Sequence, residues 1–212
     1  MEIRLRNIRS AMESKLVIFD FDGVIADSFN ICFEIIKIWY PHLTEQEYRD
    51  SFNGNIRDAS WRDPNIKTTN YYDYYDPRLL VSKPFKDMPQ TIRDFAKQHR
   101  LFIVSSTPAP VIREYLRIND IDVFEQVLGH ETHKYKDVKL QMILEKTGAR
   151  SVDSVIITDT LGDIVEARKV GVKAICVTWG FQAEEILLRG NPVAIIGHPR
   201  ELLHRVKEFF GE

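Results

Sequence analysis

Two aspartates with one residue between them, Asp20 and Asp22, end an apolar run in the segment KLVIFDFDGVIADS at residues 15–28. Alternate residues of an extended chain point to the same side, so we expect both carboxylates to face one site. One carboxylate can attack phosphorus as a nucleophile while the other acts as general acid and base. Gly23 follows at once, and glycine lets the backbone turn so that its amide groups face an anion.

Polar side chains also follow three later apolar runs. They are Ser105, Ser106 and Thr107 at the end of LFIVS (101–105), Lys134 in the loop after FEQVLG (124–129), and Asp159 and Asp163 after SVIIT (154–158). Magnesium prefers carboxylate oxygens and keeps several water ligands. Hydroxyls can donate to phosphoryl oxygens, and a lysine can neutralise charge. Phosphoryl transfer needs mainly positioning and charge stabilisation, so this combination indicates a site for a hard cation and a phosphate.

Short apolar runs alternate with amphipathic stretches along the chain. The pattern predicts strands at 15–19, 101–105, 154–158 and 173–178, with weaker candidates at 124–129 and 193–197. It predicts helices over 89–100, 110–118, 138–147, 162–170 and 201–210. Such alternation is typical of an α/β fold, with a Rossmann-like parallel sheet as the middle of three layers. Ligand sites in such sheets lie at the carboxyl ends of the strands, where the polar residues above are expected to meet.

One long region, residues 29–81, interrupts this alternation. It opens with the apolar helical stretch FNICFEIIKIWY and continues with polar and aromatic sequence such as NYYDYYDP. It is too long for a crossover and too patterned for a loop. We therefore expect an α/β core domain formed by residues 1–28 and 82–212, with a small helical cap formed by 29–81. In the cap, Asn55 and Arg57 of NGNIRD are candidates to reach a substrate, although an exposed polar loop looks the same.

Composition and charge exclude several classes of protein. The chain has 212 residues, 44% of them hydrophobic, and a net charge of −2, so a real core is expected and no basic excess points to nucleic acid. No segment approaches the ~18 apolar residues of a membrane span. The first 14 residues lack the apolar centre of a signal peptide and form either a helical or a frayed extension. Cys32 and Cys176 lie in apolar runs, as reduced core cysteines of a cytoplasmic protein do.

Four segments, in order along the chain, resemble signatures of the haloacid dehalogenase-like (HAD) superfamily of phosphohydrolases. DFDGVIADS resembles the first signature, FIVSS the second, KYKDVKLQMILEKTG the third and IITDTLGDI the fourth. The resemblance covers nearly the whole chain outside the insert, which stands where the first type of cap in this family (C1) belongs. A single DxD pair is a weak signal, whereas four ordered motifs at predicted strand ends are a strong one.

The resemblance implies a role for each matching residue. The catalytic residues would be Asp20 as nucleophile, Asp22 as acid and base, Ser105 as a phosphoryl ligand and Lys134 as a stabiliser of charge. A Mg²⁺ ion would be held by Asp20, Asp159 and the backbone carbonyl of Asp22, with Asp163 orienting a metal-bound water or the lysine. The phosphate-binding and substrate-binding residues would be Phe21, Gly23, Ser106, Thr107, Asn55 and Arg57.

The sequence departs from the family pattern at two positions. Thr158 stands where the family often has glycine, a change that need not alter metal binding. Tyr135 stands where the motif lysine is often followed by proline, so the motif lysine is either Lys134 or Lys136. Lys134 lies 14 positions before Gly148, the usual family distance to the glycine that ends the helix, and this spacing favours Lys134.

The resemblance favours a magnesium-dependent phosphomonoester hydrolase that acts on a small phosphorylated metabolite through an aspartyl-phosphate, similar to phosphoglycolate phosphatases. A phosphosugar mutase of the beta-phosphoglucomutase type is the nearest alternative, because it shares the cap type and the second aspartate. A non-catalytic binding module on the same fold is disfavoured by the intact motifs. We expect a monomer or homodimer without nucleic-acid or membrane partners.

Overall fold

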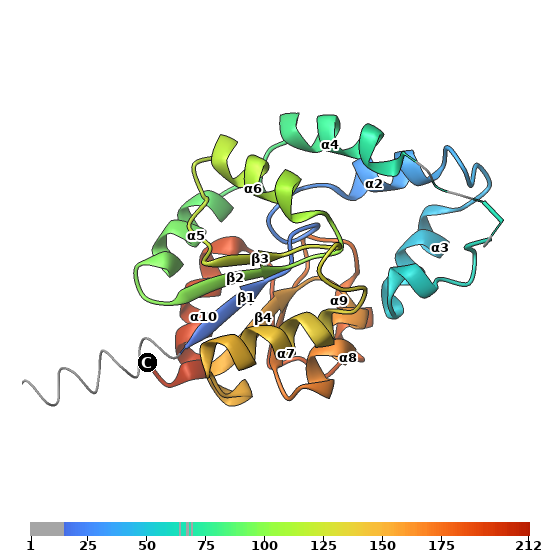
Figure 1. Ribbon diagram of the computed structural model, residues 1–212. Helices are drawn as coiled ribbons and strands as arrows, with labels where there is room; N and C mark the ends of the chain where they lie inside the picture. Colours follow the sequence, from blue (N-terminus) through green and yellow to red (C-terminus); the bar gives the residue numbers. More distant parts are fainter. Residues whose placement is uncertain (1–14, 64, 67, 69) are drawn as a thin grey trace, which may run out of the picture.

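The structure is a computed structural model that describes residues 15–63, 65, 66, 68 and 70–212 (Figure 1). The expectation for residues 1–14 lies outside the described residues. Within the described chain, one parallel sheet has the strand order β3-β2-β1-β4-β5-β6. The strands are β1 (Leu16–Phe19), β2 (Arg100–Val104), β3 (Gln126–Leu128), β4 (Ser154–Thr158), β5 (Lys173–Val177) and β6 (Ala194–Ile196). All the predicted strands are confirmed, including the two weaker candidates.

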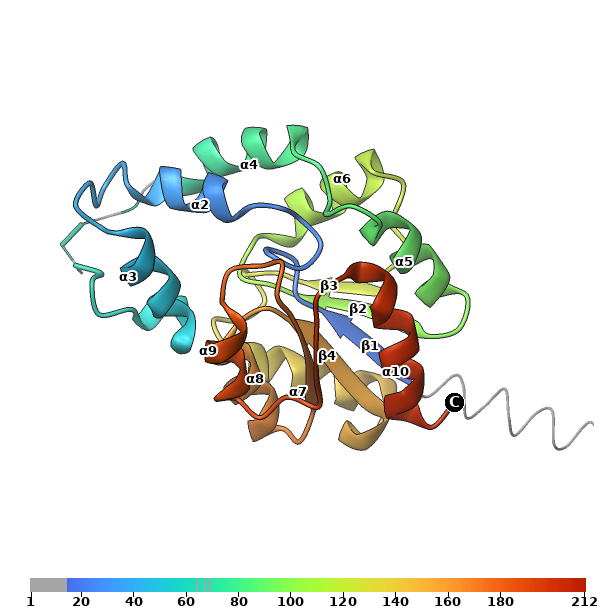
Figure 2. The same ribbon diagram turned by 180° about the vertical axis from the view of Figure 1, so that it is seen from behind.

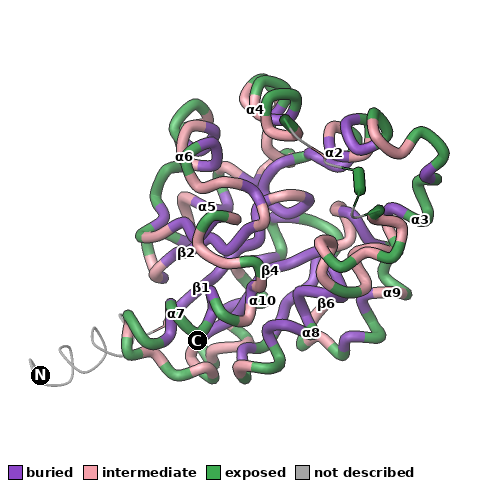
Figure 3. The backbone as a smooth tube through the Cα atoms, turned by 45° about the vertical axis from the view of Figure 1, so that its right-hand side comes forward, coloured by how far each residue is buried: buried purple, intermediate pink, exposed green. Residues whose placement is uncertain are grey.

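The central strand β1 is buried on both faces. Val17 and Phe19 belong to one apolar core, whereas Leu16 and Ile18 belong to a second core on the opposite face. Alternate side chains of a strand point to opposite faces, so a continuous apolar run suits a strand with a core on each side. Figure 3 shows that the buried stretches run through the strands at the centre of the molecule.

Helices cover both faces of the sheet (Figures 1 and 2). The first core is covered by α5 (Met88–Ala96), α6 (Ala109–Ile118) and α10 (Leu202–Phe210). The second is covered by α7 (Lys136–Thr147), α8 (Leu161–Lys169) and α9 (Glu184–Leu188). The three-layer α/β fold is therefore confirmed. Gly148, with φ of 71°, ends α7 as the sequence predicts, but the helix begins at Lys136, two residues earlier than expected.

The segment between β1 and α5 is helical, and none of its described residues between 29 and 81 joins the sheet. It contains α2 (Phe29–Ile36), α3 (Glu45–Asp50), the short 3₁₀ turns η1 (Ser51–Asn53) and η2 (Ile56–Asp58), and α4 (Tyr71–Val81). We call it the helical segment. It leaves and rejoins the core at one place, because Ala26 forms β-bridges with both Asp22 and Pro84. It lies beyond the carboxyl ends of the strands, and α4 packs on α6.

No helix in the described part of the chain combines the length and the apolar character needed to cross a bilayer. Cys32 and Cys176 are both buried free thiols.

Candidate active site

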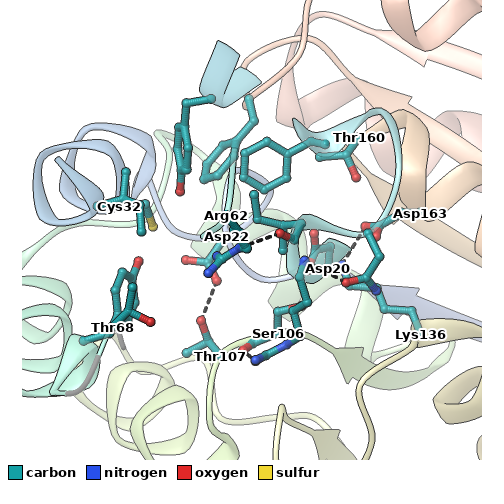
Figure 4. Close-up of a pocket in the computed structure, with 18 of the residues that line it drawn as sticks. Asp20, Asp22, Cys32, Arg62, Thr68, Ser106, Thr107, Lys136, Thr160 and Asp163 are labelled. Atoms are coloured by element: carbon teal, nitrogen blue, oxygen red, sulfur yellow. Dashed lines mark hydrogen bonds and ion pairs between the residues drawn. The ribbon is translucent and has the colours of Figure 1, made fainter. Parts of the chain in front are cut away.

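Asp20 and Asp22 line one cavity at the carboxyl end of β1 (Figure 4). Asp20 continues the ladder, because its amide donates to the carbonyl oxygen of Ile157 at 2.9 Å. Its side chain is buried, and its Oδ1 accepts a hydrogen bond of 2.7 Å from the amide of Phe21. The carboxylate is thus held in one orientation by the strand that carries it.

Lys136 is the lysine beside Asp20. Its Nζ lies 2.7 Å from Oδ1 of Asp20 and 2.6 Å from Oδ2 of Asp163, and the side chain is buried. Lys134 is exposed, and its Nζ lies 2.6 Å from Oδ1 of Asp58 in the helical segment. The expectation that Lys134 occupies this position is therefore wrong. The reason is the early start of α7: side chains in the first turn of a helix point back towards its N-terminus, which brings Lys136 to the sheet edge.

The three acids around Lys136 differ in their electrostatic environment. Burial raises the pKa of Asp20 well above its usual value; Lys136 opposes this shift, and the neighbouring Asp163 and Asp159 add to it. Burial alone would also raise the pKa of Asp163. Lys136 and a 2.6 Å hydrogen bond from the Thr158 hydroxyl outweigh this effect and bring the pKa below the usual value. Burial alone would lower the pKa of Lys136, yet Asp163 and Asp20 raise it, so the ammonium stays charged. Three buried carboxyl groups thus gather near Lys136, and a cation bound beside Asp20 and Asp159 would favour their ionised forms.

Asp159 presents the clearest feature of a cation site. Its Oδ2 accepts a 2.6 Å hydrogen bond from the amide of Phe181, whereas its buried Oδ1 has no hydrogen-bond partner among the described residues. Burial raises the pKa of Asp159 to about 7, against the effect of the Phe181 amide. A buried carboxylate oxygen without a donor is costly in a protein unless another ligand, such as a metal ion, satisfies it.

Two glycines, Gly23 and Gly180, allow the Asp159 carboxylate to lie close to the backbone. A Cβ atom at Gly23 would lie 2.0 Å from Oδ2 of Asp159, and one at Gly180 would lie 2.3 Å from it. Gly23 also has φ of +76°, in the left-handed region that favours glycine. The glycine after the aspartate pair therefore lets the fourth motif pack against the first.

The residues present fit a hard divalent cation. Asp20 and Asp159 come from the ends of neighbouring strands, and Mg²⁺ is commonly bound by one or two carboxylates with waters completing the shell. Among the described residues, no three His, Cys, Asp or Glu side chains form a metal cluster on their own. The backbone and water would therefore have to supply the remaining ligands.

Asp22 is held by three hydroxyl groups. Ser28 donates to its Oδ1 and Thr107 to its Oδ2, both at 2.7 Å, and the hydroxyl of Tyr75 also donates to Oδ1. Tyr75 lies on α4 in the helical segment and was not anticipated from the sequence. Burial, together with the Asp22 charge, raises the pKa of Tyr75 well above its usual value, so the phenol stays protonated and remains a donor.

The residues after β2 divide between the cavity and the core. Ser106 and Thr107 line the cavity. Ser105 is fully buried, its hydroxyl accepts a 2.9 Å hydrogen bond from the amide of Thr107, and its carbonyl accepts one from Lys139. Its contact with a phosphoryl group stays a prediction. The Phe21 side chain packs edge-on against Tyr115 in the core, with ring centroids 5.3 Å apart, so it does not reach the cavity.

The helical segment forms the opposite wall of the cavity, which has a volume of about 500 Å³. Asn55 and Arg57 both line it: Asn55 donates to Oε1 of Glu166 at 2.9 Å, and Arg57 donates to the carbonyl of Ser106 at 3.4 Å. The structure adds cavity residues that the sequence did not suggest, among them Arg62, Tyr48, Phe181 and Glu166, and it places Tyr71 and Tyr72, for which the sequence favoured helix packing over a binding surface, in the cavity lining as well. Their contact with a substrate, like that of Asn55 and Arg57, is a prediction.

Comparison with known proteins places this site in a family. The model of the haloacid dehalogenase-like hydrolase family matches residues 17–177, and the chain belongs to that family. The aspartates, the lysine and the sheet order described above are thus found in a chain whose sequence carries the family pattern over most of its length.

Named relatives are phosphatases. The chain is 24% identical over 206 residues to a phosphoglycolate phosphatase of Synechococcus elongatus, covering 91% of this chain and 97% of that protein. It is 22% identical over 207 residues to the pyrophosphatase PpaX of Bacillus cereus, covering 91% and 96%. The crystal structure of a predicted phosphatase from Clostridium acetobutylicum superposes with a TM-score of 0.74 at 19% identity, covering 92% of this chain and 99% of that one. The family and these relatives identify the chain as an enzyme of the phosphatase type.

Proposed function

We propose that this protein is a magnesium-dependent phosphomonoester hydrolase that acts on a small phosphorylated metabolite through an aspartyl-phosphate on Asp20. The observation that carries the proposal is the position of Lys136. It joins Asp20 to Asp163 at the floor of a cavity that Asp22 also lines. A nucleophile, a fixed positive charge and a second carboxylate are thus present together, as phosphoryl transfer requires.

In the first step, Asp20 attacks phosphorus and the ester oxygen leaves. Lys136 and the Phe21 amide both bind Oδ1 of Asp20, which leaves Oδ2 as the attacking oxygen. Asp22 gives a proton to the leaving oxygen. In the second step, Asp22 takes a proton from water, which attacks the phosphorus and releases phosphate and free Asp20. A bound Mg²⁺ held by Asp20 and Asp159 would neutralise charge on the phosphoryl oxygens.

The helical segment serves as the cap of this site in our proposal. Hydrogen bonds and ion pairs join it to the core around the cavity mouth, from Asn55 to Glu166, Lys134 to Asp58, and Gln182 to Asn53. At Gly162, a Cβ atom would lie 2.3 Å from the carbonyl oxygen of Gly54, so the two parts touch at backbone distance. These contacts exclude water and would form again each time a substrate is enclosed.

Removing the metal tests the proposal directly. Purified protein should release inorganic phosphate from p-nitrophenyl phosphate with Mg²⁺, and EDTA should lower the rate by at least about 100-fold, because several kcal/mol of charge stabilisation are lost. Excess Mg²⁺ should restore it, and Asp159→Asn should raise the Mg²⁺ concentration needed for half-maximal rate. Full activity in protein shown to be metal-free would contradict the proposal. Release of free phosphate, rather than transfer to another hydroxyl of the substrate, separates a hydrolase from a mutase.

Asp22→Asn should affect the two chemical steps differently. p-Nitrophenolate leaves without help, so the first turnover should be nearly normal and the second step should slow by about 10²- to 10⁴-fold, giving a burst of p-nitrophenol. An alkyl phosphate needs a proton on its leaving oxygen, so for this substrate the first turnover should slow as well. Rapid-quench measurement of both substrates checks this. If Asp22→Asn slowed the first turnover equally for both substrates, Asp22 would not be the general acid.

A further inference from the structure

The cavity has two chemically different ends. The first end holds Asp20, Asp22 and Lys136, which the proposed reaction uses. The second lies within the helical segment, from which Arg62 and several tyrosines line the cavity. Nothing in the proposed chemistry needs a cation at this second end.

Arg62 has no anionic partner in the part of the chain that the structure describes. Its Nε donates to the carbonyl of Ile56 at 2.8 Å, and its guanidinium lies 4.8 Å from the ring centroid of Trp61. Among the described residues, no carboxylate forms an ion pair with Arg62 or with Arg57. A guanidinium has five donors in a planar fork, so most of its capacity for a carboxylate or phosphate is unused in the contacts described.

The surroundings of Arg62 make this cation costly to leave unpaired. Burial lowers its pKa from the usual value, the neighbouring Tyr48 and Tyr40 oppose the shift, and the charge of Arg57 adds to it. Two arginines that line one cavity, neither of them paired with a carboxylate among the described residues, favour the binding of an anion there. Besides Asp20, Asp22 and Asp163, two acids line the cavity. Glu166 is bound by Asn55 and by the amides of Lys136 and Asp137, and the exposed Asp73 forms no ion pair with either arginine.

Apolar and aromatic side chains line much of the cavity. They include Ile36, Tyr48, Phe52, Ile56, Tyr71 and Phe181. The rings hold one another edge-on: Phe52 lies 5.0 Å from Phe181 and 5.2 Å from Tyr48 between centroids. A volume of about 500 Å³ lies in the range of pockets that enclose ligands with a carbon skeleton, and it exceeds what a two-carbon ester such as phosphoglycolate would fill. Apolar walls of this extent favour a substrate with apolar surface to bury.

We infer that the substrate is a phosphate monoester with an apolar body of about ring size that carries a second anionic group, and that Arg62 binds this second anion. The inference rests on the proposed function, because it takes the Asp20 end of the cavity as the phosphoryl site. Arg57 has a different part: its bond to the Ser106 carbonyl places it beside the phosphoryl end, so it serves every substrate alike.

Matched substrates test whether Arg62 binds the second anion and Arg57 acts at the phosphoryl end. The probes are phenyl phosphate, 4-carboxyphenyl phosphate, its longer 4-(2-carboxyethyl) homologue, the neutral carboxamide of each acid, and phosphoglycolate. In wild-type protein, kcat/KM for at least one acid should exceed that for its carboxamide by about 10- to 100-fold, the usual worth of hydrogen bonds to a charged group. Arg62→Gln should bring this acid-to-amide ratio down to about one, and the ratio is the readout whatever the variant does to phenyl phosphate turnover. Comparing the acid-to-amide ratio between proteins cancels the difference in leaving group.

Two further variants serve as controls. Arg57→Gln should lower kcat/KM for all the aromatic esters by similar factors and preserve the acid-to-amide ratio. Arg78→Gln replaces an arginine of α4 that pairs with Glu34 and does not line the cavity, so it should change nothing. Thermal unfolding reports whether Arg62→Gln is folded, and Arg62→Lys, which keeps the charge, should retain part of the preference.

Specific outcomes overturn the inference. No acid preference at either length in wild type, or a preference that survives Arg62→Gln, would refute an anion site at Arg62. A higher kcat/KM for phosphoglycolate than for both aromatic acids would refute the apolar body. If wild-type protein hydrolyses none of the esters, the hydrolase proposal itself fails. Calorimetric binding of each acid and its amide to Asp20→Asn protein, with Mg²⁺ and without turnover, then still decides whether Arg62 binds an anion.

Discussion

Asp20→Asn should abolish phosphate release, lowering kcat by at least about 10³-fold, because an amide oxygen is a far weaker nucleophile than a carboxylate. The fold should survive, since asparagine keeps the oxygen that accepts from the Phe21 amide, and Lys136 keeps Asp163 as its partner at 2.6 Å. The substitution also removes a charge whose burial raises the pKa of Asp20, so we expect little loss of stability. Steady-state phosphate release from p-nitrophenyl phosphate, with thermal unfolding alongside, measures both effects.

Asp27→Asn is the matched control for that variant. Asp27 lies in the same motif, is exposed and does not line the cavity, so its substitution should leave kcat within about twofold. Acid quenching of wild-type protein during turnover of labelled substrate should also trap phosphate on the chain, and the Asp20→Asn protein should trap none. Undiminished turnover by Asp20→Asn would end the assignment of Asp20 as nucleophile.

Replacement of Lys136 by methionine should lower kcat by about 10²- to 10³-fold, the usual effect of removing one preorganised charge or donor from a transition state. Lys134→Met should leave kcat within about twofold, because Lys134 is exposed and forms its ion pair with Asp58 rather than with Asp20 or Asp163. The free energy of unfolding without Mg²⁺ should fall by about 3–5 kcal/mol in Lys136→Met, because two buried carboxylates lose their partner. Kinetics of the two variants side by side, with chemical denaturation, give the comparison.

A third lysine variant shows whether Lys136→Met loses activity through misfolding or through loss of the catalytic charge. Lys136→Arg keeps the positive charge, so it should recover stability more than it recovers kcat, since the longer planar group cannot occupy the same position. If Lys134→Met were the inactive variant and Lys136→Met the active one, the catalytic lysine would be the one that the motif spacing favoured, and the structural placement would not describe the working enzyme.

The core elements could be predicted because their signals are local. A run such as SVIIT is apolar and β-branched wherever it stands, and Gly148 marks a helix end through its own backbone preference. The lysine could not be chosen in the same way. The spacing to Gly148 measures the end of α7, whereas the position of the lysine depends on where α7 begins, and that start is set by contacts of its first turn, such as the Glu166 carboxylate on the Lys136 amide.

The wall formed by the helical segment was the least predictable part of the site. Arg62 lies in irregular chain after η2, where no periodicity indicates the direction of a side chain, and its contacts with the Trp61 ring and the Ile56 carbonyl depend on the path of that irregular chain. The sequence does carry a signal for Tyr75. Tyr71 and Tyr75 are four residues apart and share one face of α4, with their ring centroids 5.7 Å apart. That spacing predicts packing, but it does not predict that one hydroxyl reaches Asp22.

The hydrogen bond from the Tyr75 hydroxyl to Asp22 has a consequence for protein engineering. Ser28 and Thr107 come from the α/β core, whereas Tyr75 comes from the helical segment, so one carboxylate takes its donors from both parts of the chain. A chimera that replaces residues 29–81 with the segment of a relative exchanges one of these donors together with the substrate-facing wall. Grafting for new specificity should therefore keep a tyrosine at position 75, or select a donor segment that supplies a hydroxyl at the same place.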